Sequence, residues 1–101
     1  AQRAENTTEA EQKVYSGEMM QIFARFGEIM EESPSGDKAK ALVNELKDFI
    51  TSHYYNCTSE ILLGLGQMYV QDERFRRNID TAGGEGTAQF TAEAIESYCG
   101  E

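Results

Sequence analysis

Apolar residues recur along this chain at intervals of three and four, the spacing that places them on one face of an α-helix. The first predicted helix begins near Thr8 and is strongest from 18 to 32. Its apolar stripe is rich in methionine and phenylalanine and contains Tyr15, Met19, Ile22, Phe23, Phe26, Ile29 and Met30. The segment 33–36, with one proline and one glycine, predicts the end of this helix. A second helix follows, capped by Ser35 or Asp37, with its apolar face running from Ala39 to His53.

The third predicted helix, from Ile61 to Val70, is apolar on every side of the helical wheel, which is typical of a buried helix. Gly64 and Gly66 each cost about 1 kcal/mol relative to alanine inside a helix. They therefore indicate a place where another backbone or a ligand comes close. The residues that could cap this helix are Asn56, Cys57 and Thr58.

Asp72 predicts the start of a short fourth helix, from Glu73 to Asp80, because its side chain can accept hydrogen bonds from the next amides. Residues 81–86 predict a glycine-rich loop, and Thr87 is expected to cap a last helix that ends at Gly100. No segment alternates with the period of two that is typical of a strand. We therefore expect an all-α domain over 13–101, preceded by a flexible linker over 1–12.

Composition limits the possible functions. The chain has 101 residues, enough for one domain. Its net charge of −9 disfavours binding to nucleic acid or to anionic lipid. We expect no membrane span and no export signal, because there is no long apolar run and no basic leader. Two cysteines do not suggest a disulfide-rich secreted protein, so we expect a reducing compartment such as the cytoplasm. Since the chain starts at Ala1 rather than at methionine, we expect it to be a piece of a longer protein.

His53 and Cys57 stand four residues apart and would share one side of a continuous helix. Such a pair could supply half of a metal site or a thiolate–imidazole nucleophile. A closed zinc site needs four ligands, and no third group is evident that would orient the imidazole. The favoured interpretation is a buried histidine and a small buried thiol. We therefore expect no metal, no cofactor and no catalytic activity.

Methionines and tyrosines suggest a binding surface. Four methionines and ten aromatic residues give adaptable, polarizable surfaces, of the kind that repack around apolar ligands of different shapes. Core packing remains the default role of any one of them. The five tyrosine hydroxyls would each need a partner in a dry core, whereas the wall of a cleft could use them. An acidic cluster at 28–32 is interpreted as a solvated helix face.

Two segments carry a more specific signal than periodicity does. The run Gly66-Gln67-Met68-Tyr69-Val70-Gln71-Asp72-Glu73-Arg74-Phe75, followed by Asn78-Ile79-Asp80, and the later run Gly86-Thr87-Ala88-Gln89-Phe90 with Ala94-Ile95 resemble the thiostrepton-recognising domain of the TipA-like regulators. The upstream segment His53-Tyr54-Tyr55-Asn56-Cys57 is similar to the pattern of the same family. The close resemblance covers residues 50–98.

The resemblance implies a five-helix, globin-like fold without haem, which binds apolar antibiotics or multiple drugs in a surface cleft. It also implies that a DNA-binding domain of the MerR family and a dimerising coiled coil precede this domain, so that DNA would be bound only through a missing N-terminal part of a homodimer. The family's thiopeptide-capturing member has a cysteine at the position of Gly64, so reversible binding is expected here. With the surplus of methionine and tyrosine, this predicts a ligand site formed by Met19, Phe23, Phe26, Met30, His53, Tyr54, Cys57, Met68, Tyr69 and Phe75.

Two other functions compete with this one. An enzyme would have to rely on Cys57 and His53, and would show a reactive thiol. A helical protein-interaction module would use its Met/Phe stripe to bind a partner helix. Finding that stripe covered by the other helices, with a separate pocket open beside it, would argue against an interaction module.

Overall fold

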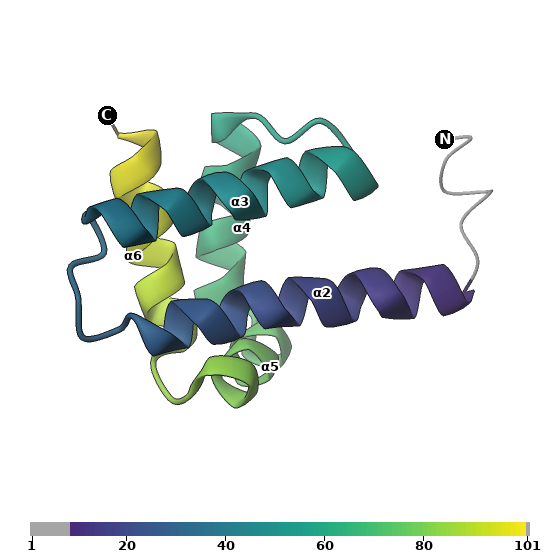
Figure 1. Cartoon of the computed structure of the whole chain (residues 1–101), viewed down its shortest axis with the longest axis horizontal. Helices are drawn as coiled ribbons and strands as arrows, with labels where there is room; N and C mark the ends of the chain where they lie inside the picture. Colours follow the sequence, from purple (N-terminus) through teal and green to yellow (C-terminus); the bar gives the residue numbers. More distant parts are fainter. Residues whose placement is uncertain (1–8, 101) are drawn as a thin grey trace.

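The computed structural model describes residues 9–100 of the chain, and their side chains from residue 17 onward. Five helices form this part: α2 (Glu9–Glu28), α3 (Asp37–His53), α4 (Ser59–Gln71), α5 (Glu73–Gly83) and α6 (Thr87–Cys99) (Figure 1). The predicted all-α fold is confirmed, whereas its globin-like character remains a prediction. Between residues 9 and 100, no helix has both the length and the hydrophobicity that a membrane span requires.

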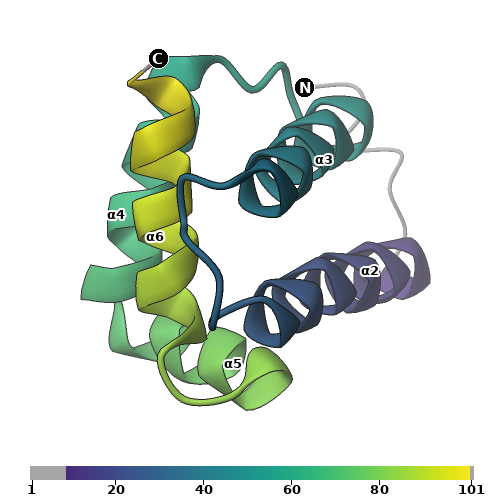
Figure 2. The same cartoon turned by 60° about the vertical axis from the view of Figure 1, so that its left-hand side comes forward.

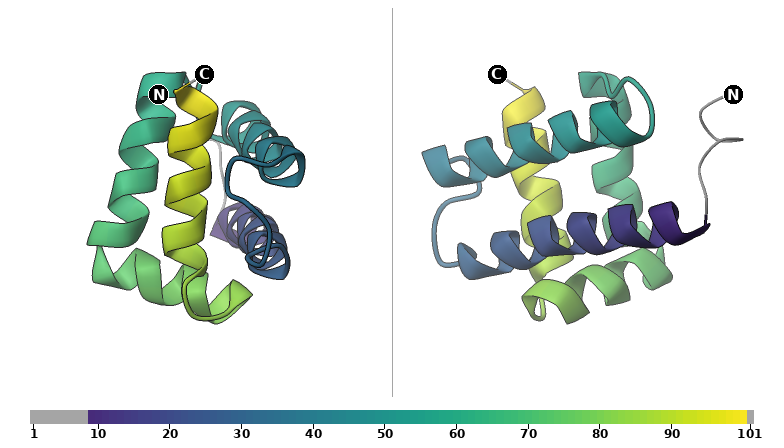
Figure 3. Two further views of the ribbon diagram at one scale, coloured as in Figure 1. Left: turned by 90° about the vertical axis from the view of Figure 1, so that its left-hand side faces the viewer. Right: turned by 45° about the vertical axis from the view of Figure 1, so that its right-hand side comes forward.

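The helices form two layers that cross each other. Helices α2 and α3 run antiparallel in one layer, and α4 and α6 run antiparallel in the other (Figure 2). Helix α5 lies along α2 and closes the lower edge of the molecule (Figure 3). Helix α2 extends beyond the end of α3, so its first turns have no helix beside them in their own layer (Figure 1).

The core lies between the two layers and uses the predicted apolar faces. Ile22, Phe23 and Phe26 of α2 are buried, and the buried residues of α3 are Ala39, Leu42, Val43, Leu46 and Ile50. The second layer contributes Leu62, Tyr69 and Ile95 among others, and α5 contributes Ile79. The periodicity of these helices therefore predicted the inward faces of α2 and α3 correctly.

The start of α2 at Glu9 agrees with the predicted start near Thr8, whereas the end of the helix differs from the prediction. The helix already includes residues 9–12, which the sequence assigned to the linker, and residues 1–8 lie outside the described part. It ends at Glu28 rather than at Glu32, because the chain turns at Ile29, whose amide bonds to the Phe26 carbonyl. The turn brings the Met30 thioether to 3.7 Å from the Thr87 hydroxyl at the start of α6.

Three of the predicted helix ends are confirmed. The Thr58 side chain accepts a hydrogen bond from the Ile61 amide, and Asp72 accepts from the amides of Arg74 and Phe75. Gly100 follows the last residue of α6. These residues could be identified because each cap uses a side chain or a glycine within the same short segment.

Two predicted caps are wrong. Glycine, not serine or aspartate, stands at the start of α3, since Gly36 is its N-cap. At α6 the N-cap is Gly86 rather than the predicted Thr87. The side chain of Asp80 in α5 accepts the hydrogen bond from the Ala88 amide near the start of α6. Helix α5 also runs three residues further than predicted, to Gly83. A cap supplied from another helix leaves no local signal in the sequence.

Helix α4 is not buried on every side, which corrects the prediction from its composition. Only Leu62, Gly66 and Tyr69 are buried, and Ile61 is 40% exposed. At Gly66 a methyl group would lie 3.3 Å from the Ile95 side chain, so this glycine does mark a close approach between α4 and α6. At Gly64 no atom of the described residues lies within 4 Å of the added methyl group, so Gly64 does not mark such a close approach.

The Thr91 hydroxyl is buried and has no hydrogen-bond partner among residues 9–100, so we predict that Thr91→Val stabilises the domain. Valine keeps the shape and removes the unpaired group, which should raise the free energy of unfolding by about 1 kcal/mol in a urea titration. Thr87→Val is the matched control. Its hydroxyl is equally buried but donates to the Gly84 carbonyl at 2.6 Å, so this change should destabilise the domain. Equal effects of the two changes would contradict the prediction.

Candidate functional site

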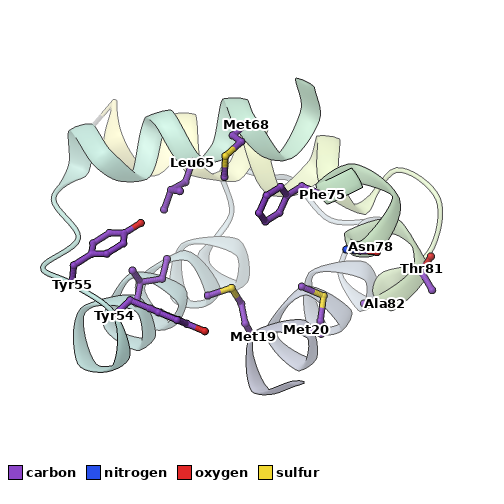
Figure 4. Close-up of a pocket in the computed structure, with 11 residues that line it drawn as sticks. Met19, Met20, Tyr54, Tyr55, Leu65, Met68, Phe75, Asn78, Thr81 and Ala82 are labelled. Carbon is purple, nitrogen blue, oxygen red and sulfur yellow. The ribbon is translucent and has the colours of Figure 1, made fainter. Parts of the chain in front are cut away.

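A cleft of about 650 Å³ opens where the core ends, between the middle of α2, the end of α3 and helices α4 and α5 (Figure 4). Phe23 of α2 meets Tyr69 of α4 edge to face, with ring centroids 5.2 Å apart. Met19 lies one turn before Phe23, and Met68 is the neighbour of Tyr69 in sequence. Both methionines line the cleft. The cleft therefore begins about one helical turn away from the Phe23–Tyr69 contact, which joins the two layers of helices.

The first two helices supply one wall of the cleft. It is lined by Met19 and Met20 of α2, by Ile50 of α3, and by Tyr54 and Tyr55 after α3. The end of α3 at His53 determines this arrangement. There the backbone leaves helical geometry, and the amides of Tyr54 and Tyr55 both bond to the Ile50 carbonyl. Because the chain then crosses to α4, two tyrosines stand at the mouth of the cleft.

Helices α4 and α5 supply the other wall, with Leu65, Met68, Phe75, Asn78, Thr81 and Ala82. The Asp72 cap positions the last four of these. It ends α4 and starts α5 at the same residue, so the two helices meet in a sharp corner. On α5 the lining residues follow the spacing of one helical face. The ring of Phe75 lies 6.0 Å from that of Tyr69, next to the core.

None of the eleven lining residues carries a charge. Three are methionines, and three more are aromatic: Tyr54, Tyr55 and Phe75. The cleft thus offers an apolar surface with adaptable thioethers and few polar groups. Such a surface binds uncharged apolar molecules, because a charged ligand would lose its hydration without gaining a partner.

The structure places four of the ten predicted site residues at the cleft: Met19, Tyr54, Met68 and Phe75. Phe23, Phe26 and Tyr69 are core residues, and burial raises the pKa of the Tyr69 hydroxyl. Met30 lies at the other end of α2, beside Thr87. A ligand role for these four residues therefore has no support from their positions.

His53 and Cys57 do not line the cleft either. The His53 ring stacks on Phe49 at a centroid distance of 4.3 Å, and its Nδ1 lies 2.9 Å from the Phe49 carbonyl oxygen. Cys57 is buried, and its amide bonds to the Thr51 hydroxyl. Within the described residues, no three histidine, cysteine or acidic side chains lie together in a way that could hold a metal ion.

The sequence did not identify seven of the lining residues: Met20, Ile50, Tyr55, Leu65, Asn78, Thr81 and Ala82. A signal was present on α5, where Phe75, Asn78 and Ala82 share the face that begins at the Asp72 cap. Tyr55 could also have been identified from the sequence, because two tyrosines adjacent in sequence point in different directions and cannot both pack into the same core. Ile50 and Leu65 gave no such signal, since apolar helix positions are most often core.

The Cys57 thiol should be unreactive, because burial raises its pKa and lowers the fraction of thiolate at neutral pH. We predict that Cys57 in the folded Cys99→Ala variant is labelled by a thiol reagent at the rate of global unfolding. Cys99, which is only half-buried, should react faster in the Cys57→Ala variant. Cys57→Ala should itself cost about 1 kcal/mol of unfolding free energy. Rapid labelling of Cys57 at neutral pH would contradict this prediction.

The sequence pattern of the TipAS antibiotic-recognition domain matches residues 1–98. The HTH-type transcriptional activator mta of Bacillus subtilis (strain 168) is 40% identical over 78 residues, which are 77% of this chain and 30% of that protein. The HTH-type transcriptional activator TipA of Streptomyces coelicolor is 35% identical over 77 residues, covering 74% of this chain and 30% of its own length. The chain thus spans less than a third of these relatives. No solved structure gives a significant match.

Proposed function

Because the chain belongs to the TipAS antibiotic-recognition domain family, we propose that it is the effector-sensing domain of a MerR-family transcriptional regulator. In this proposal, residues 13–101 bind apolar antibiotics or drug-like molecules reversibly in the cleft. DNA binding and dimerisation belong to a part of the protein outside this chain, in a cytoplasmic homodimer. The observation that supports ligand binding is the cleft of about 650 Å³, whose size is typical of small-molecule sites and whose lining is uncharged.

Reversible binding is supported by the positions of the thiols. Neither cysteine lines the cleft, and Cys57 is buried below the junction of α3 and α4. At the position of the family cysteine, Gly64 is exposed on α4 and offers no nucleophile. A ligand in the cleft is therefore held by apolar contacts and hydrogen bonds.

A protein-interaction module is the alternative function, and the packing argues against it. Ile22, Phe23 and Phe26 of the Met/Phe stripe are covered by the other helices. The cleft lies beside this stripe and remains open. A partner helix would have to displace the core to reach the stripe, whereas a small molecule can enter the cleft directly.

The N-terminal half of α2 links the cleft to the rest of the regulator in this proposal. Met19 and Met20 lie near the middle of α2, at the inner end of this half, and α2 continues from there beyond the end of α3 (Figure 1). A ligand that contacts both α2 and α4 stabilises the arrangement in which they face each other, and so shifts the population toward it. The ordered helix would carry the signal toward the missing N-terminal domain.

Hydrogen exchange with the neutral dye Nile red tests the proposal. We predict that saturating dye increases amide protection over residues 12–32, because binding closes the cleft against α2. The affinity of Met19→Ala for the dye, from fluorescence titration, should fall at least about fivefold. Met30→Ala is the matched control, with a methionine just after the other end of α2 that does not line the cleft, and should keep its affinity. Dye binding that protects only α6 would refute both the site and the signalling route.

A further inference from the structure

The cleft has two polar ends and an apolar middle (Figure 4). Tyr55 stands at one end, near the junction of α3 and α4, and Asn78 stands at the other end, on α5. Met19, Met68 and Phe75 lie between them. The lining therefore changes along its length from a hydroxyl, through thioether and ring surfaces, to a carboxamide.

The two end groups are available to a ligand. Tyr55 is 47% exposed, and neither its hydroxyl nor the Asn78 carboxamide makes a hydrogen bond with any described residue. The Thr81 hydroxyl beside Asn78 already donates to the Arg77 carbonyl at 2.8 Å, so it can only accept a further hydrogen bond. Both ends can thus donate and accept, because a phenol hydroxyl and a carboxamide each do both.

The side chains in the middle of the cleft disfavour a charged ligand. Among the described residues, these side chains include no carboxylate or cationic group that could pair with an ionised ligand. The chain as a whole carries a net charge of −9, which attracts cations to the surface but does not place a counter-ion in the cleft. An ionised group held between the methionines would therefore stay unpaired.

We propose that the cleft selects an uncharged, elongated, conjugated ring molecule with one hydrogen-bonding group at each end. One end of this molecule bonds to the Tyr55 hydroxyl, and the other end bonds to the Asn78 carboxamide. The rings between them lie against Met19, Met68 and Phe75. This specificity rests on the proposed function, because it concerns the same cleft.

Three probes of one shape test this specificity: trans-stilbene, its derivative with one para-hydroxyl group, and its derivative with a para-hydroxyl group on both rings. Their affinities are measured by fluorescence titration on the parent chain, on Tyr55→Phe, on Asn78→Leu and on the double variant. Both substitutions lie at exposed positions and keep the size of the side chain, so folding is retained. Each hydroxyl should improve the affinity for the parent about threefold to tenfold.

The affinities of the probes for the variants show whether Tyr55 and Asn78 each bind one end of the ligand. The dihydroxylated probe should lose about threefold to tenfold in each single variant, and trans-stilbene should lose nothing in any variant. The monohydroxylated probe can bind in either direction, so only the double variant should weaken its binding. A stilbene with an amidinium group at each end should bind more weakly than the dihydroxylated probe at physiological salt.

Failure of this inference can be distinguished from failure of the proposed function. Equal affinity of all three neutral stilbenes, unchanged in the variants, would overturn the end-group specificity and leave an apolar cleft in place. The same conclusion holds if no stilbene binds while Nile red binds in a Met19-dependent manner. Tighter binding of the diamidinium probe would overturn the selection against charge. If neither dye nor stilbene binds, both the inference and the proposed function fail.

Discussion

Gly27→Ala should unfold the domain or cost it at least about 3 kcal/mol, because two backbones touch at this position. A methyl group on Gly27 of α2 would lie 2.6 Å from the Cα and carbonyl carbon of Gly83 at the end of α5. Neither atom belongs to a flexible side chain, so α2 and α5 would have to separate. Since small domains have a total stability of about 5–15 kcal/mol, this is a large fraction of the total.

Gly17→Ala is the matched control for this effect. It lies in the same helix, but no atom is within 4 Å of its missing methyl group. The change should therefore stabilise α2 by up to about 1 kcal/mol through helix propensity alone. Urea denaturation followed by circular dichroism measures both variants. If Gly27→Ala were as stable as the parent, α2 and α5 would not be in backbone contact.

The Gly27–Gly83 contact also determines the shape of the cleft. Gly83 is confined on both sides, since a methyl group there would lie 2.8 Å from the Phe23 carbonyl oxygen. Helix α5 can lie along α2 only because both residues lack a side chain. Met20 and Asn78, on opposite walls of the cleft, are positioned by this contact between their helices.

The sequence predicted those parts of the fold that depend on local patterns. The helical periods of α2 and α3 identified their buried faces, and Thr58 and Asp72 identified two helix starts, because a cap needs only one side chain and the next few amides. Contacts between distant segments were not predictable in this way. The Asp80 cap of α6 and the Gly27–Gly83 contact each join residues that no local pattern relates.

The residues that line the cleft were harder to predict from the sequence than the fold, for a physical reason. Buried aromatic residues and cleft-lining aromatic residues follow the same helical spacing, so Phe23 and Phe26 could not be separated from Met19 by sequence. Whether a residue of this apolar stripe is buried or lines the cleft depends on where the opposite layer of helices ends. Tyr69 of α4 covers Phe23, whereas the space opposite Met19 stays open.

Phe26→Ala is expected to cost about 3–5 kcal/mol of unfolding free energy, because Phe26 belongs to the core and does not line the cleft. Its side chain is fully buried, and its ring meets Phe90 of α6 at a centroid distance of 6.4 Å. Truncation leaves a cavity between the two layers that rigid helices cannot fill. Ile61→Ala removes an apolar side chain that is 40% exposed, so this control should cost about 1 kcal/mol or less.

Ligand binding separates the two possible roles of Phe26. If Phe26 only supports the fold, the folded fraction of Phe26→Ala should bind Nile red with the affinity of the parent, once the unfolded fraction is measured by urea titration. The apparent dissociation constant then equals that of the parent divided by the folded fraction, since the dye binds the folded state only. A variant as stable as the parent that no longer binds the dye would contradict this assignment. Phe26 would then contact the ligand, and the cleft would have to reach deeper between α2 and α6 than the lining from Met19 to Ala82.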